Sequence, residues 1–326
     1  MRCLCCNKEL KNHNNYWHKS CIKKFFNTEE FPKIGLTSSN QLLNEYAENL
    51  VTNKDSITGV QKKLPLHLSK ENDEYRLTLV GYPSGYILKP ESEDYPFIAK
   101  SEHLVMSMAN ECGIKTPLHG LILLNDNSYA YITKRMDRTE NGKIHMEDFC
   151  QLLERLTEYK YNSSHERIGK AIDKYSTLKK LDKIEFVYRT IFNFIVGNSD
   201  MHLKNFSLIE EKNKSYLSPA YDLLPVNIIV DDEEEVALSL NGKKKNITKN
   251  DFIKFGENIG VEKEIINKLF LRFIAKKEKL ISCVNDSLLD EEVKINFIDL
   301  INKRINRLIE YKNHSKLMFQ IKIGNS

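Results

Sequence analysis

The chain has 326 residues, of which 41% are hydrophobic and 29% are charged. This length and composition allow two compact lobes with buried cores, so intrinsic disorder is not expected. The net charge of +4 comes from 49 basic and 45 acidic residues, a balance too even to indicate a nucleic-acid-binding protein. No stretch is long and apolar enough to span a bilayer, and the N-terminus lacks the apolar core of a secretion signal. We therefore expect a cytoplasmic protein without membrane contact.

The N-terminal end of the chain is rich in cysteine. Four of the seven cysteines lie there: Cys3, Cys5, Cys6 and Cys21. Cys3 and Cys6 have the two-residue gap of a metal knuckle, and His18 and Cys21 repeat that gap. Three thiolates and one imidazole are a ligand set that tetrahedral structural zinc accepts. We expect residues 1–30 to form a zinc-knuckle-like segment with a closed, structural site and Cys5 as the spare thiol. A reduced tail with incidental cysteines is the alternative.

The next part of the chain, residues 31–135, has the pattern of a small β-rich lobe. A linker at 29–39 leads into a short predicted helix at 41–50. Short apolar runs separated by turn formers then predict an antiparallel sheet, with strands at 64–68, 75–80, 118–124 and 129–133. Between the second and third of these runs, apolar residues from Leu104 to Cys112 recur at helical spacing, and Gly113 suits the end of that helix.

The remaining residues, 136–326, have the pattern of a helical lobe. Apolar residues recur at helical spacing in four segments, at 146–156, 184–195, 265–273 and 293–308. Strands with one helix followed by helices predict an α+β, two-lobed fold like that of protein kinases, preceded by the zinc-knuckle-like segment.

The segment 197–205 has the spacing of a kinase catalytic loop. In such loops an Asp is the base and an Asn five positions later is a Mg²⁺ ligand, roles that Asp200 and Asn205 match. A predicted hairpin, with strands at 206–209 and 215–217, would return Asp222 to the same site as a second Mg²⁺ ligand. Either acid alone could instead cap a turn or a helix. Together with the preceding helix and an upstream lysine-bearing strand, the two acids indicate phosphoryl transfer.

Five segments of the chain carry a resemblance to a known family. They are 56–63 (SITGVQKK), 86–90 (YILKP), 134–138 (KRMDR), 197–206 (GNSDMHLKNF) and 219–224 (PAYDLL). In these segments, and in their order, the chain resembles the HipA-type toxin kinases of bacterial toxin–antitoxin operons. Its glycine loop begins near Ser56, whereas longer members carry roughly a hundred additional residues ahead of that loop. The chain is thus more similar to the shortened HipT-type toxins, in which the missing subdomain is a separate small protein.

The resemblance implies roles for several residues around an ATP site. Lys89 would bind the α/β-phosphates, and its expected partner is Glu102 on the following helix, although a helical Glu is often simply exposed. The phosphate-covering loop would use backbone groups, at Thr58, Gly59, Gln61 and Lys63. Backbone groups of Lys134 and Met136 would hold the adenine. His202 or Lys204 would steady the transferred phosphoryl group, and the sequence does not choose between them.

The resemblance also implies regulation and partners. Ser56 and Thr58 begin the glycine loop and are expected sites of autophosphorylation. The expected substrate is a protein of the translation apparatus, such as an aminoacyl-tRNA synthetase. A helix-turn-helix antitoxin and a small N-subdomain-like protein are expected partners, with DNA reached only through the antitoxin. Two alternatives stay open: a small-molecule kinase of the aminoglycoside type, and a catalytically silent kinase-shaped module that binds an antitoxin.

Overall fold

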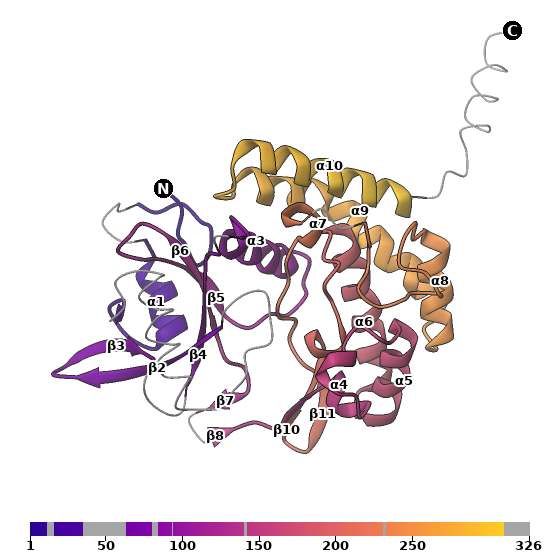
Figure 1. The fold of residues 1–326 in the computed structure, drawn as a ribbon, viewed down its shortest axis with the longest axis horizontal. Helices are drawn as coiled ribbons and strands as arrows, with labels where there is room; N and C mark the ends of the chain where they lie inside the picture. The colour runs from indigo at the N-terminus through magenta and orange to yellow at the C-terminus, as the bar shows by residue number, and fades with distance from the viewer. Residues whose placement is uncertain are drawn as a thin grey trace, which may run out of the picture.

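The computed structural model describes residues 1–11, 16–34, 63–79, 84–92, 94–139, 142–230 and 233–309. Two lobes lie side by side, a β-rich lobe formed by the N-terminal part of the chain and a helical lobe formed by the C-terminal part (Figure 1). The expected α+β architecture of two lobes is therefore confirmed. The helix predicted at 41–50 and the loop residues 56–62 lie outside the described residues.

The small lobe is a six-stranded sheet with the order β1-β3-β2-β4-β6-β5. Its strands are β1 (Lys33–Ile34), β2 (Leu64–Glu71), β3 (Glu74–Thr78), β4 (Tyr86–Pro90), β5 (His119–Leu123) and β6 (Tyr129–Lys134). Adjacent strands pair antiparallel except β1, which runs parallel to β3. Asn72 and Asp73 form the β2–β3 turn with positive φ, a conformation that Asn and Asp tolerate. All four strands predicted for this lobe are confirmed.

Helix α3 (Ile98–Glu111) is almost entirely buried between the sheet and the helical lobe. Its buried side chains include Leu104, Val105 and Met108, the residues whose spacing predicted it. The helix ends as expected, because Gly113 has a φ of +83° that an L side chain rarely adopts. This helix carries Glu102 beneath the sheet, so its placement controls the cleft described below.

The helical lobe surrounds α6 (Lys179–Ile195), which is buried along most of its length. The other helices are α4 (Phe149–Leu152), α5 (His165–Tyr175), α7 (Val226–Ile229), α8 (Lys249–Asn258), α9 (Lys263–Asn285) and α10 (Glu291–Leu308). A small sheet ordered β11-β10-β9 lies beside them, from β9 (Met146–Asp148), β10 (Ser207–Glu211) and β11 (Lys214–Leu217). A short hairpin of β7 (Arg138–Thr139) and β8 (Gly142–Lys143) precedes it. None of the helices that the structure describes could span a lipid bilayer.

One prediction for the helical lobe is wrong. The apolar residues at 146–156 do not share a helix, because Met146 begins strand β9 and pairs with Ile209 of β10. Asp148 then caps a helix of only four residues, in a capping box with Gln151. Leu156 is 66% exposed rather than packed in the core. The cap and the strand pairing interrupt a periodicity that, in sequence, looked continuous.

The N-terminal segment, residues 1–30, packs against the small lobe instead of standing apart. Its helix α1 (Lys19–Phe26) follows His18. Leu121 of the edge strand β5 donates a backbone hydrogen bond to Leu4 (2.8 Å) and accepts one from the Trp17 indole (2.8 Å). A Cβ at Gly120 would lie 2.5 Å from the Trp17 ring, so only glycine allows this close approach. The segment thereby covers an edge strand that would otherwise expose backbone groups.

Candidate active site

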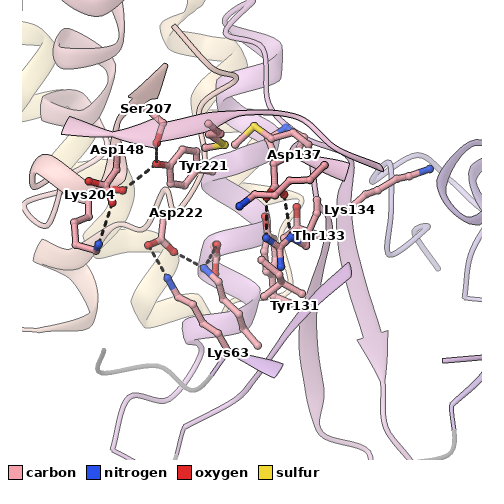
Figure 2. A pocket seen from close by; sticks show the side chains of 18 of the residues that line it. Lys63, Tyr131, Thr133, Lys134, Asp137, Asp148, Lys204, Ser207, Tyr221 and Asp222 are labelled. Carbon is pink, nitrogen blue, oxygen red and sulfur yellow. Dashed lines mark hydrogen bonds and ion pairs between the residues drawn. The ribbon is translucent and has the colours of Figure 1, made fainter. Parts of the chain in front are cut away.

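A cleft of about 290 Å³ lies between the two lobes. Seven of the sequence-predicted site residues line it: Lys63, Lys89, Glu102, Lys134, Met136, Lys204 and Asp222. Figure 2 shows Asp222 facing the cleft, with the ammonium group of Lys63 against its carboxylate. Residues far apart in sequence therefore meet at one polar site between a sheet and a helical layer.

A chain of alternating charges forms the inner end of the cleft. Lys89, on β4, donates to Glu102 of α3 at 2.6 Å and also to Asp222. Lys63 donates to the second oxygen of Asp222 at 3.0 Å. Lys89 and Glu102 are 5% and 1% exposed, so solvent hardly screens their attraction. The helical position predicted for the partner of Lys89 is correct, and Glu102 is not a surface residue.

These contacts determine the ionisation of the cleft. Burial opposes ionisation of Asp222, but the two lysines outweigh it and hold the pKa of Asp222 well below its usual range. Burial also works against a charged Lys89, yet Asp222 and Glu102 raise the pKa of Lys89 above its ordinary value. Burial raises the pKa of Glu102 to about 7 in spite of Lys89. Asp222 is thus an ionised carboxylate with a φ of +59°, an uncommon backbone conformation of the kind found at functional sites.

The predicted catalytic loop follows directly from α6. Gly197, with a φ of +71°, turns the chain, and a Cβ there would lie 2.5 Å from Leu300. The Asn205 amide nitrogen donates to the Asp200 carbonyl at 2.9 Å, which leaves the amide oxygen as the atom able to bind a cation. The Asp200 carboxylate accepts a hydrogen bond from Tyr161. Burial raises the pKa of Asp200, and the nearby charge of Asp222 adds to this rise.

The structure separates His202 from Lys204. The His202 side chain is buried, and its Nδ1 has no hydrogen-bond partner among the described residues. Burial lowers the pKa of His202 to about 4, so the ring is neutral near pH 7. Lys204 lines the cleft and forms an ion pair with Asp148 at 2.9 Å (Figure 2). Of the two, Lys204 is the side chain that presents a positive charge to the cleft.

The lobe junction offers backbone groups for a planar ligand. The Lys134 amide donates to the Leu118 carbonyl at 2.8 Å, so only its carbonyl is considered for a ligand. The Met136 amide has no backbone acceptor within the described part of the chain. One acceptor and one donor two residues apart suit the edge of a purine base.

Several residues of the candidate site were missed in the sequence analysis. Tyr131 lies opposite Lys89 on β6, and the ammonium group of Lys89 lies 5.4 Å from its ring centroid. Tyr221 donates to the Lys204 carbonyl at 2.9 Å. Asp148 had a sequence signal, the Asp-x-x-Gln capping pattern that we read as part of a longer helix. Tyr161 had none, because its contact with Asp200 joins positions 39 residues apart.

A second candidate site lies in the N-terminal segment. The ligand atoms of Cys3, Cys6, His18 and Cys21 all lie within 4.8 Å of one another. His18 Nδ1 is 3.3 Å from the Cys6 sulfur and 3.9 Å from the Cys21 sulfur. His18 Nε2 lies 3.0 Å from the Glu9 carbonyl, the contact that fixes the tautomer of a metal-binding imidazole. These four predicted side chains converge as a tetrahedral zinc site requires.

The fold and the charged cleft together define a protein of the two-lobed kinase class. The HipA-like C-terminal domain family matches residues 55–281, and the chain belongs to this family. It is 31% identical, over 72% of this chain and 76% of the other, to a Haemophilus influenzae protein whose name marks it as a suspected kinase. It is 25% identical to the serine/threonine-protein kinase toxin HipA of Shewanella oneidensis over 57% of this chain, and the match covers 46% of that toxin.

The solved structure of Shewanella oneidensis HipA, in a complex with HipB and operator DNA, has a similar fold. The TM-score is 0.63 at 20% sequence identity, over 81% of this chain and 70% of that chain. The family resemblance seen in the sequence is thereby confirmed. These findings support a HipA-type kinase.

Proposed function

We propose that this chain is an ATP- and Mg²⁺-dependent serine/threonine protein kinase, and the toxin of a type II toxin–antitoxin system of the shortened HipT kind. One observation carries the proposal: the buried chain of charges from Glu102 through Lys89 to Asp222, which joins both lobes at the cleft. A silent kinase-shaped module would have no need of buried charges, which are costly to desolvate. The buried charges therefore favour an enzyme over the non-catalytic alternative.

The side chains present fit a nucleotide and a magnesium ion. Asp222 is ionised and already attracts two ammonium groups. The side-chain nitrogen of Asn205 donates a hydrogen bond to Asp200, so its side-chain oxygen is the atom that can bind a cation. Carboxylate and amide oxygens are ligands that Mg²⁺ prefers, so these two residues would hold it. Lys89 and Lys204 would bind phosphate oxygens, as would backbone groups of the loop at 58–63. When bound, ATP would supply the phosphoryl group, and Mg²⁺ would offset part of the negative charge of the phosphates.

Asp200 is the proposed base. Its carboxylate already accepts a hydroxyl hydrogen bond, from Tyr161, which is the contact that a substrate serine or threonine would make. Burial raises the pKa of Asp200, which makes its carboxylate a better proton acceptor than an exposed one. Asp200 would thus orient the substrate hydroxyl and take its proton as the new O–P bond forms and the bond from the γ-phosphorus to the leaving ADP breaks.

Purified protein is expected to hold one zinc ion per chain. Three thiols and one correctly oriented imidazole provide a closed site, whose role is structural because no position is open to substrate. Metal analysis of protein prepared without chelator measures it. Cys6→Ser should lower the zinc content well below one, and Cys5→Ser should leave it unchanged. Wild-type protein without zinc would show that the segment is an ordinary tail.

Autophosphorylation at Ser56, Thr58 or both is expected to weaken ATP binding by about tenfold. A phosphate adds nearly two negative charges beside the proposed phosphate site, and Lys63, at the end of the same loop, could pair with it. Ser56 and Thr58 lie outside the described residues, so the argument uses sequence position alone. Titration calorimetry should find weaker binding to the phosphorylated protein and to a Ser56→Asp/Thr58→Asp variant than to Ser56→Ala/Thr58→Ala. Equal affinities would rule out a switch in this loop.

The proposed substrate is a protein of translation in the cytoplasm, such as an aminoacyl-tRNA synthetase. The proposed partners are a helix-turn-helix antitoxin and a small protein that replaces the N-terminal subdomain of longer toxins. The Shewanella oneidensis HipA complex with HipB and operator DNA supports an antitoxin of this kind. Contact with DNA would be indirect, through the antitoxin.

The molecule that accepts the phosphate distinguishes a protein kinase from the remaining alternative, a small-molecule kinase. Wild-type protein with labelled ATP and Mg²⁺ is offered aminoacyl-tRNA synthetases in one reaction and aminoglycosides in another. Label on serine or threonine of a protein supports the proposal. Label on the antibiotic alone would establish a small-molecule kinase and overturn it.

A further inference from the structure

A turn in the N-terminal segment contacts α3 beside the active site. The turn closes where the Asn7 amide donates to the Cys3 carbonyl at 2.9 Å. Asn7 directly follows Cys6, one of the proposed zinc ligands, and has a φ of +57°. Zinc bound by Cys3 and Cys6 would therefore fix the backbone that presents the Asn7 side chain.

The Asn7 side chain makes two contacts with α3. Its Oδ1 lies 3.3 Å from His103 Nε2, and its Nδ2 donates to Ser107 Oγ at 3.3 Å. His103 and Ser107 are four residues apart, so they lie on one face of the helix. Among the described contacts, these two hydrogen bonds join the metal-binding turn directly to the helix that carries Glu102.

A row of buried polar groups continues the contact into the small lobe. His103 Nδ1 lies 3.0 Å from His119 Nδ1, and His119 Nε2 lies 3.3 Å from the Asn110 amide. One pattern of protons satisfies every contact: His103 donates to Asn7, His119 donates to His103, and Asn110 donates to His119. Both imidazoles are then neutral, in keeping with burial, which lowers the pKa of His103 to about 4. The row therefore links the Asn7 side chain to α3 and to β5 through consecutive hydrogen bonds.

The same stretch of α3 holds the catalytic ion pair. Glu102, adjacent to His103, binds Lys89 at 2.6 Å. A shift of α3 of about 1 Å would break this bond, because hydrogen bonds weaken steeply with distance. Lys89 would then lose one of the two carboxylates that hold its ammonium group in the cleft.

We propose that Asn7 is a positioning residue, and that zinc at Cys3, Cys6, His18 and Cys21 acts through it to hold α3 and Glu102 in the nucleotide-binding arrangement. The inference rests on the proposed kinase function, because Lys89 matters only if a nucleotide binds. Within the described part of the segment, the other hydrogen bonds and ion pairs to the rest of the chain do not involve α3: Leu4 and Trp17 bind β5, and Arg2 forms an exposed ion pair with Asp286 at 2.7 Å. Exposed ion pairs of that kind contribute little to stability.

The test compares Asn7→Gly with Asn27→Gly. Glycine tolerates the positive φ of Asn7 and removes only its two side-chain contacts with α3. Asn27 is the matched control, because it also lies in the segment with a positive φ of 61°, and its side chain is exposed. Zinc content and the fluorescence of Trp17, the sole tryptophan, verify that the segment stays folded and docked in both variants.

Three quantities are measured, the first two on zinc-loaded protein. Amide hydrogen exchange across 98–111 should be about fivefold faster in Asn7→Gly, the loss expected for about 1 kcal/mol of hydrogen bonding. ADP with Mg²⁺ should bind about fivefold more weakly. In wild type, the nucleotide should tighten zinc binding by the same factor that zinc tightens nucleotide binding, since coupling is reciprocal. Asn27→Gly should match wild type in each measurement.

The outcomes separate this inference from the kinase proposal. If Asn7→Gly and Asn27→Gly agree in exchange and in nucleotide affinity, the positioning role is overturned while the kinase proposal stands. If wild type binds no nucleotide, the kinase proposal fails and the role of Asn7 in nucleotide binding falls with it. Faster exchange in α3 and weaker nucleotide binding confined to Asn7→Gly support the inference.

Discussion

Replacing Asp200 by Asn is expected to reduce phosphoryl transfer by about 10²–10⁴-fold, the contribution of a positioned general base. The amide keeps the shape of the side chain but cannot accept the substrate proton. The fold should persist, because the substitution alters one hydrogen bond, from the partly exposed Tyr161, worth about 1 kcal/mol. Single-turnover rates at saturating ATP measure the effect, and the affinity for ATP should change little.

Asp173→Asn is the control for this prediction. It removes the same charge from the same lobe, but Asp173 is exposed and pairs with Lys183 on the surface. Its transfer rate should equal that of wild type. A rate for Asp200→Asn within about threefold of this control would exclude Asp200 as the base.

Replacing Lys89 by Met should abolish activity and destabilise the protein by about 3–5 kcal/mol at pH 8, the cost of leaving a buried charge without its partner. Glu102 is 1% exposed, and its pKa is already raised to about 7 with Lys89 present. Without the lysine this pKa rises further above its unfolded value. Stability is then greatest at low pH and is lost as pH rises through the folded pKa of Glu102, so the variant should be less destabilised at pH 5 than at pH 8. Denaturant unfolding of the variant and of wild type at pH 5 and pH 8 measures this difference in stability.

The double variant Lys89→Met/Glu102→Gln provides the control. It removes the buried carboxylate, so it should recover stability at pH 8 and lose most of the pH dependence, while activity stays absent. A Lys89→Met variant as stable as wild type at pH 8 would mean that the ion pair is not buried as described.

The sequence predicted those parts of the fold that local patterns determine. The strands at 64–68 and 129–133 alternate clearly, and α6 and α10 have uninterrupted apolar faces. At 146–156 the pattern misled, because pairing of Met146 with Ile209 is a long-range contact that no local periodicity encodes.

In the candidate site, too, some residues could be predicted from the sequence and others could not. Asp200 and Asn205 have a motif spacing, and their proximity follows from a short loop. The contact of Asp148 with Lys204 depends on how two distant segments pack. The hydrogen bonds from Asn7 to His119 could not be predicted either, because they join three segments that are distant in sequence: the N-terminal turn, α3 and the edge strand β5. Motif spacing and the family resemblance predicted the charged residues of the cleft, whereas contacts outside those motifs required the structure.

Labelling of the protein by ATP tests whether this cleft transfers the γ-phosphate. Wild-type protein and Asp200→Asn are incubated with γ-labelled ATP, with Mg²⁺ or with chelator, and each protein is then analysed by mass spectrometry. Label is expected on serine or threonine of the wild type, only with Mg²⁺, and none is expected on Asp200→Asn. An unlabelled wild type that binds ATP without transferring phosphate, or equal labelling of both proteins, would contradict it.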